Sequence, residues 1–66
     1  MTMTRAEKIK RQITDIRDSG VVNMFDVRKV QKIAKGRGYW SLVNFIDYDK
    51  NGYVNFIMTG NELYLS

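Results

Sequence analysis

The stretch TRAEKIKRQITDIRDSG, residues 4–20, carries the clearest structural signal in the chain. Its apolar side chains recur every three or four residues, which places them on one face of a helix: Ala6, Ile9, Ile13 and Ile16. Thr4 and Glu7 have the spacing of a capping box at a helix start. Gly20 favours the left-handed conformation in which many helices end. We therefore predict a helix over residues 4–19.

Two further helices are predicted after this one. Asn23 is a favourable N-cap for a helix over residues 23–35, whose inner face would consist of Val27, Val30 and Ala34. The next segment, residues 39–47, is apolar almost all round. This pattern is typical of the most buried helix of a domain.

Residues 53–65 are ambiguous between two structures. Their Tyr, Val, Phe and Ile residues favour a strand, but the apolar run is nearly continuous, so its periodicity decides nothing. A β-hairpin and a short helix therefore both stay open. The sequence predicts a mainly α fold, in which residues 1–66 form a single small domain of three helices with a short C-terminal helix or β-hairpin.

The composition excludes several classes of protein. The chain has 66 residues, no Cys and no His, so disulfides and zinc sites with Cys or His ligands are ruled out. The usual general base and the best nucleophile are also missing. We expect a protein that is not an enzyme and needs no cofactor.

The apolar stretches are shorter than the roughly 20 residues needed to cross a bilayer. The N-terminus also lacks the apolar core of a signal peptide. We therefore expect a cytoplasmic protein without a membrane partner.

Positive charge is concentrated in the first part of the chain. The net charge is +4, and residues 1–37 hold ten of the eleven Lys and Arg residues. The helix over residues 23–35 would present four of these cations on its outer face. The predicted contact set for nucleic acid or an acidic partner consists of Phe25, Arg28, Lys29, Lys32, Lys35 and Arg37. The alternative is an ordinary solvated helix face.

The helices over residues 23–35 and 39–47 have a spacing compatible with a helix-turn-helix. The second helix of that motif must present polar side chains to bases, and residues 39–47 are too apolar for that task. Any nucleic-acid contact is therefore expected to use phosphates rather than base edges.

The run Asp47-Tyr-Asp-Lys-Asn-Gly-Tyr-Val54 resembles the first eight positions of an EF-hand calcium loop. Its oxygen ligands would come from Asp47, Asp49, Asn51 and Tyr53. Met58 stands where the bidentate Glu is required, and Met does not bind a hard cation. We favour a polar turn without metal and keep a degenerate calcium site as an alternative.

Several short pieces together resemble a family of small uncharacterised proteins from phages and prophages of Gram-positive bacteria. They are Ile-Arg-Asp-Ser-Gly (16–20), Asn-Met-Phe-Asp-Val (23–27), Val-Gln (30–31), Leu-Val (42–43), Phe-Ile (45–46) and Phe-Ile-x-Thr-Gly (56–60). The resemblance covers about residues 8–60. It implies a phage origin, a bacterial host cytoplasm and helical structure near residues 47–58.

The function expected from these observations is that of a non-catalytic accessory or regulatory phage protein. The aromatic-rich last third favours binding to a protein partner, such as a host or defence factor or a second copy of the chain. The alternatives are a basic nucleic-acid-binding protein that contacts phosphates and a degenerate EF-hand-like calcium module.

Overall fold

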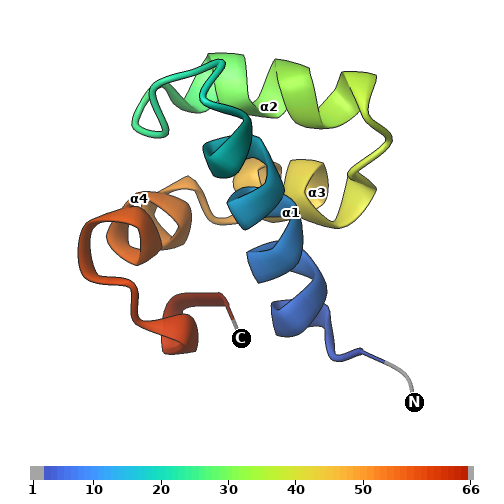
Figure 1. Ribbon diagram of the computed structural model, residues 1–66. Coiled ribbons are helices and arrows are strands. Elements are labelled where there is room, and N and C mark those ends of the chain that lie inside the picture. Colours follow the sequence, from blue (N-terminus) through green and yellow to red (C-terminus); the bar gives the residue numbers. More distant parts are fainter. Residues whose placement is uncertain (1–2, 66) are drawn as a thin grey trace.

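The computed structural model describes residues 3–65, and within this range the fold consists of helices without any strand (Figure 1). The elements are α1 (Arg5–Ser19), α2 (Val27–Gly36), α3 (Trp40–Tyr48), α4 (Lys50–Thr59) and a 3-10 turn, η1 (Glu62–Leu65). The mainly α class is confirmed. Of the two alternatives for the C-terminal segment, the helix is correct and the β-hairpin is wrong.

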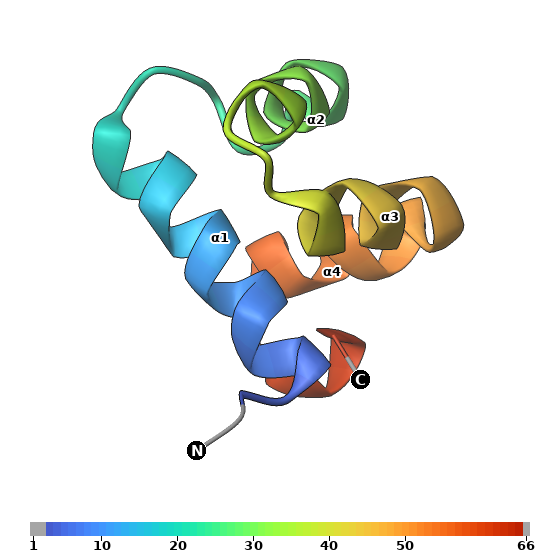
Figure 2. The same cartoon turned by 90° about the vertical axis from the view of Figure 1, so that its right-hand side faces the viewer.

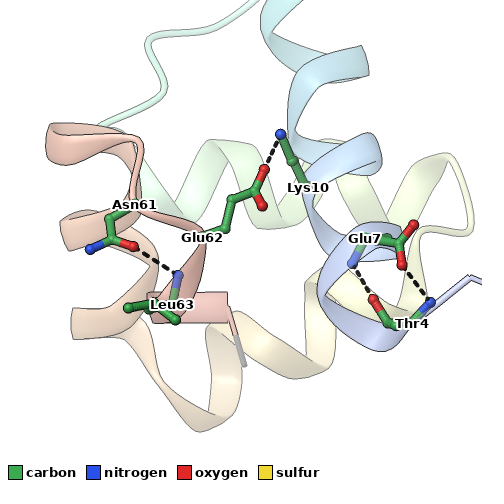
Figure 3. Close-up of polar contacts among 6 residues, drawn as sticks. All are labelled: Thr4, Glu7, Lys10, Asn61, Glu62 and Leu63. Carbon is green, nitrogen blue, oxygen red and sulfur yellow. Dashed lines mark hydrogen bonds and ion pairs between the residues drawn. The ribbon is translucent and has the colours of Figure 1, made fainter.

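The predicted capping box of α1 is present (Figure 3). The Glu7 amide donates to Thr4 Oγ1 over 3.1 Å, and the Thr4 amide donates to Glu7 Oε1 over 3.3 Å. Gly20 ends the helix in the left-handed conformation, with φ 67°. The predicted apolar face lies inward, where three of its members are fully buried: Ile9, Ile13 and Ile16. The prediction for this helix is confirmed at both ends.

The start of α2 was predicted three residues too early. The Asn23 side chain accepts a hydrogen bond from the Phe25 amide, and its carbonyl accepts one from the Asp26 amide, both over 2.9 Å. Asn23 thus forms a turn, and Asp26 is the actual N-cap, accepting from the Lys29 amide over 3.4 Å. Asn and Asp both cap helices well. Which of Asn23 and Asp26 becomes the N-cap of α2 therefore depends on the tertiary contacts that hold the preceding loop.

The central position predicted for the third helix is confirmed. α3 packs against α1, α2 and α4, and in Figure 2 it lies beneath α2 and beside α1. Its core side chains are all buried: Leu42, Val43, Phe45 and Ile46. Gln12 of α1 accepts a hydrogen bond from the Leu42 amide over 3.0 Å. This bond ties the first turn of α3 to the middle of α1.

The fourth helix forms despite its strand-favouring residues. The Asp49 carboxylate caps it by accepting from the Gly52 amide over 2.9 Å. Tyr53 and Phe56, three residues apart, then enter the core on one helical face. Strand preference mainly reflects how a side chain packs, and these side chains find their packing on a helix. Gly60 ends α4 with φ 70°.

The segment after α4 closes one end of the core. Leu65 is buried, and Glu62 forms an ion pair with Lys10 of α1 (Figure 3). The Leu63 amide donates to Asn61 Oδ1 over 3.0 Å, which starts the turn. η1 therefore covers the N-terminal half of α1.

Both ends of the described chain lie on the side of the molecule away from α2 (Figures 1 and 2). In both views, none of the other helices formed by residues 3–65 lies over the outer side of α2. Among residues 3–65, no helix combines the length and the apolar composition that crossing a bilayer requires.

Candidate nucleic-acid interface

The outward side of α2 carries the largest group of unpaired cations on one helix. Val30 and Ala34 are fully buried, which fixes the rotation of the helix and turns its opposite side to solvent. We call this opposite side the α2 basic face; it consists of Arg28, Lys29, Lys32 and Lys35, all exposed. None of the four has an ion-pair partner among residues 3–65. The predicted clustering is present, and its binding role stays a prediction.

Arg37 does not belong to this face. Its guanidinium lies 3.0 Å from Asp15 Oδ2, and its side chain is 34% exposed. The Tyr39 hydroxyl donates to the same carboxylate. This hydrogen bond, helped by the nearby guanidinium, lowers the pKa of Asp15 below its ordinary value. The same hydrogen bond raises the pKa of Tyr39, although the Arg37 guanidinium acts in the opposite direction on that hydroxyl. The structure therefore assigns Arg37 to a contact between α1 and the α2–α3 connection.

Phe25 lies in the turn that precedes α2, at the N-terminal end of the basic face. Its side chain is 54% exposed, so it does not tuck under the helix start. Asp26 follows it directly, and its carboxylate is engaged as the N-cap. The face is thus bordered at this end by an aromatic ring and by an acid that is already hydrogen-bonded.

The residues proposed for calcium are split between two helices. Asp47 is in α3 and accepts a hydrogen bond from Gln31 Nε2 over 2.5 Å, whereas Asp49 is the α4 cap. Asn51 lies in the first turn of α4. Tyr53 is fully buried, and its hydroxyl donates to the Met24 carbonyl over 2.8 Å. The segment is a helix junction and not a coordinating loop. Residues 3–65 contain no group of three or more acidic side chains suited to a metal.

A groove that sequence reasoning missed lies between α1 and the start of α3. Its volume is about 500 Å³, and its walls are formed by Met3, Lys8, Arg11, Gln12, Asp15, Gly38, Tyr39, Trp40 and Ser41. These residues come from two stretches far apart in the sequence, 3–15 and 38–41, so no local pattern marks them. The one available signal was Trp40, a large aromatic residue just ahead of the buried run that begins at Leu42.

Residues 3–61 match the family described as domain of unknown function (DUF5049). The chain belongs to this family. The predicted resemblance to an uncharacterised family is therefore confirmed, whereas the phage and Gram-positive origin stays a prediction. No curated protein and no solved structure shows significant similarity to the chain.

In this DUF5049 chain, the aromatic residues of the last third are divided between core and surface. Phe45, Tyr53 and Phe56 are buried. The large apolar side chains that stay exposed come from four different segments: Val21, Phe25, Trp40, Tyr48, Met58, Leu63 and Tyr64. Much of the aromatic content that favoured a protein partner is therefore used in folding.

The exposed side of α3 bears on the helix-turn-helix question for this DUF5049 domain. Its outward residues are Trp40, Asn44, Asp47 and Tyr48. This side has no Arg or Lys, the residues that make the commonest specific contact with a base in the major groove. The geometry therefore supports contact through phosphates over insertion of α3 into a duplex.

Proposed function

We propose that this chain is a non-catalytic nucleic-acid-binding protein that contacts phosphates through the α2 basic face. One observation carries the proposal: Arg28, Lys29, Lys32 and Lys35 share one outward helix face and are not neutralised by any described acid. Phosphate contacts of this kind release condensed counterions and supply most sequence-independent affinity.

The composition of the face favours nucleic acid over a protein surface. The centre of a protein–protein interface is depleted in charge, and lysine in particular is uncommon there. Three of the four residues of the α2 basic face are lysines, and no apolar side chain lies among them. Long, flexible cationic side chains suit a repeating phosphate backbone better than a packed apolar contact.

A protein partner is the second candidate function. The exposed apolar side chains support it, and Trp40 and Tyr48 are the largest of these on the central helix, 58% and 91% exposed. In the biological setting that we propose, a small phage protein acts on a macromolecule of the phage or its bacterial host in the cytoplasm. A pull-down from bacterial extract with and without nuclease separates the two candidates, since a protein partner survives nuclease treatment.

The direct test is a salt titration of oligonucleotide binding, followed by fluorescence anisotropy. We expect binding at low salt whose affinity falls steeply as salt rises. The double variant Lys32→Gln/Lys35→Gln should lower the slope of log affinity against log salt by about 1 to 2, because each phosphate contact contributes roughly 0.9 or less to it.

Lys50→Gln provides the matched control, because Lys50 is an exposed cation on α4, outside the α2 basic face. This variant should keep the slope of the parent protein. Absence of binding to any DNA or RNA oligonucleotide at low salt would refute the proposal. If a polyglutamate peptide of the same charge binds as tightly as the oligonucleotide, the ligand of the α2 basic face is an acidic protein and not nucleic acid.

A further inference from the structure

We infer that the groove between α1 and the start of α3 receives an unpaired base, so that the protein binds single-stranded nucleic acid in preference to duplex. The inference rests on the proposed function and specifies its ligand. The groove has a volume of about 500 Å³, and it opens beside the connection through which α2 leads into α3.

The groove is cationic. Lys8 and Arg11 line it, both are exposed, and neither has an ion-pair partner among the described residues. Asp15 also lines it, but this carboxylate already faces Arg37 and the Tyr39 hydroxyl. Two cations are thus left without compensation at its edge, which complements a phosphate group.

Trp40 supplies the aromatic surface. It is the only tryptophan of the chain, it lies at the first residue of α3, and its side chain is 58% exposed. Its indole lies beside Gly38, since a Cβ at that glycine would be 3.9 Å from Trp40 Nε1. An open indole next to unpaired cations is the combination on which proteins stack the bases of single strands. A base inside a duplex is already stacked on both faces, so neither face is available to stack on the indole.

Gln12 adds a polar group to the same wall. Its Oε1 accepts from the Leu42 amide over 3.0 Å, which holds the side-chain amide in place. Its Nε2 has no hydrogen-bond partner among residues 3–65, so it is free to donate to the edge of a base beside Trp40.

The groove begins just after the C-terminal end of α2. α2 ends at Gly36, and Gly38, two residues later, already lines the groove. We expect a strand whose phosphates follow Lys32 and Lys35 toward this end of α2 to reach Trp40. An exposed aromatic ring elsewhere, such as Tyr48, would not have this continuity.

The sole tryptophan gives a direct readout of occupancy. We expect a thymine oligonucleotide of about ten residues, a length within the usual range for such sites, to quench Trp40 fluorescence on binding. A duplex of equal length should bind through α2 without quenching and about tenfold more weakly, because its bases stay stacked. Trp40→Leu should bring single-strand affinity down to the duplex level and leave duplex affinity unchanged.

A second variant guards against effects on folding. Lys8→Gln/Arg11→Gln keeps the tryptophan and should weaken single-strand binding with little effect on duplex binding, whereas the matched control Tyr48→Ala should change neither. Circular dichroism confirms that each variant is helical.

Three outcomes overturn the inference. Equal affinity for both oligonucleotides with an unquenched tryptophan would leave the α2 function standing and refute the groove. If the parent protein binds neither the single-stranded oligonucleotide nor the duplex, both the proposed function and the groove inference are refuted. Quenching by polyglutamate equal to that by the oligonucleotide would make the groove a site for an acidic peptide.

Discussion

A single buried hydroxyl joins α4 to the loop between α1 and α2. Tyr53 has no exposed surface, and its hydroxyl donates to the Met24 carbonyl in the loop between α1 and α2. We expect Tyr53→Phe to lower the free energy of unfolding by about 1 to 2 kcal/mol at neutral pH, because the partly buried Met24 carbonyl loses its partner. Urea unfolding followed by circular dichroism measures this change, and Tyr48→Phe at an exposed site should leave stability unchanged.

The same residue makes stability sensitive to alkaline pH. Burial raises the pKa of Tyr53, so the folded protein keeps this proton at pH values where the unfolded chain, with an ordinary pKa of about 10, has lost it. The contribution of Tyr53 is therefore complete below about pH 10 and declines as pH rises further. The stability difference between the parent and Tyr53→Phe should narrow in this range. A constant difference up to pH 11 would contradict this assignment.

At the level of elements, Asp49 decides where α4 begins. We expect Asp49→Ala to cost about 1 kcal/mol of unfolding free energy, the usual range for losing an N-cap being 0.5–2. Asp49→Asn keeps a capping oxygen and should stay within a few tenths of the parent. Thermal unfolding of the three proteins provides the comparison. If Asp49→Ala and Asp49→Asn lose the same unfolding free energy, the charge of the Asp49 carboxylate, and not its capping hydrogen bond, stabilises α4.

How far the sequence predicts each element depends on how local its signals are. α1 is predicted at both ends because Thr4, Glu7 and Gly20 act on their own neighbours. The start of α2 is misplaced because Asn23 and Asp26 compete as caps, and the nearby contact that fixes their loop comes from Tyr53, about 30 residues away. α4 is left open because Tyr53 and Phe56 become helical through packing that no local preference encodes.

For the candidate site, the same distinction separates what was predicted from what was missed. The α2 basic face follows from helical periodicity alone, since every member lies on one element. The pairing of Arg37 with Asp15, which removes Arg37 from the face, joins residues 22 positions apart. The groove around Trp40 requires α1, the α2–α3 connection and α3 to be assembled first. Neither the Arg37–Asp15 pair nor the groove could be predicted from a local sequence pattern.

For the whole molecule, the narrow stability margin of a 66-residue chain makes its last turn important. Leu65 is 2% exposed and closes the core beneath α1 and α4. Leu65→Ala should cost about 2 to 4 kcal/mol, a large share of the 5–15 kcal/mol typical of domains. Leu63→Ala, at a site 77% exposed, is the matched control. Similar urea midpoints for both variants would mean that η1 contributes little to stability.

The Asn51-Gly52 pair at the start of α4 has a consequence for the chemical ageing of the protein. In flexible chains the glycine nitrogen attacks the preceding asparagine side chain, and the resulting succinimide hydrolyses to aspartate or isoaspartate. Here that nitrogen donates to Asp49 Oδ1 within a helical turn, an arrangement that keeps it from the attack. Deamidation at Asn51, followed by mass spectrometry during storage, should therefore proceed only as fast as this helix frays.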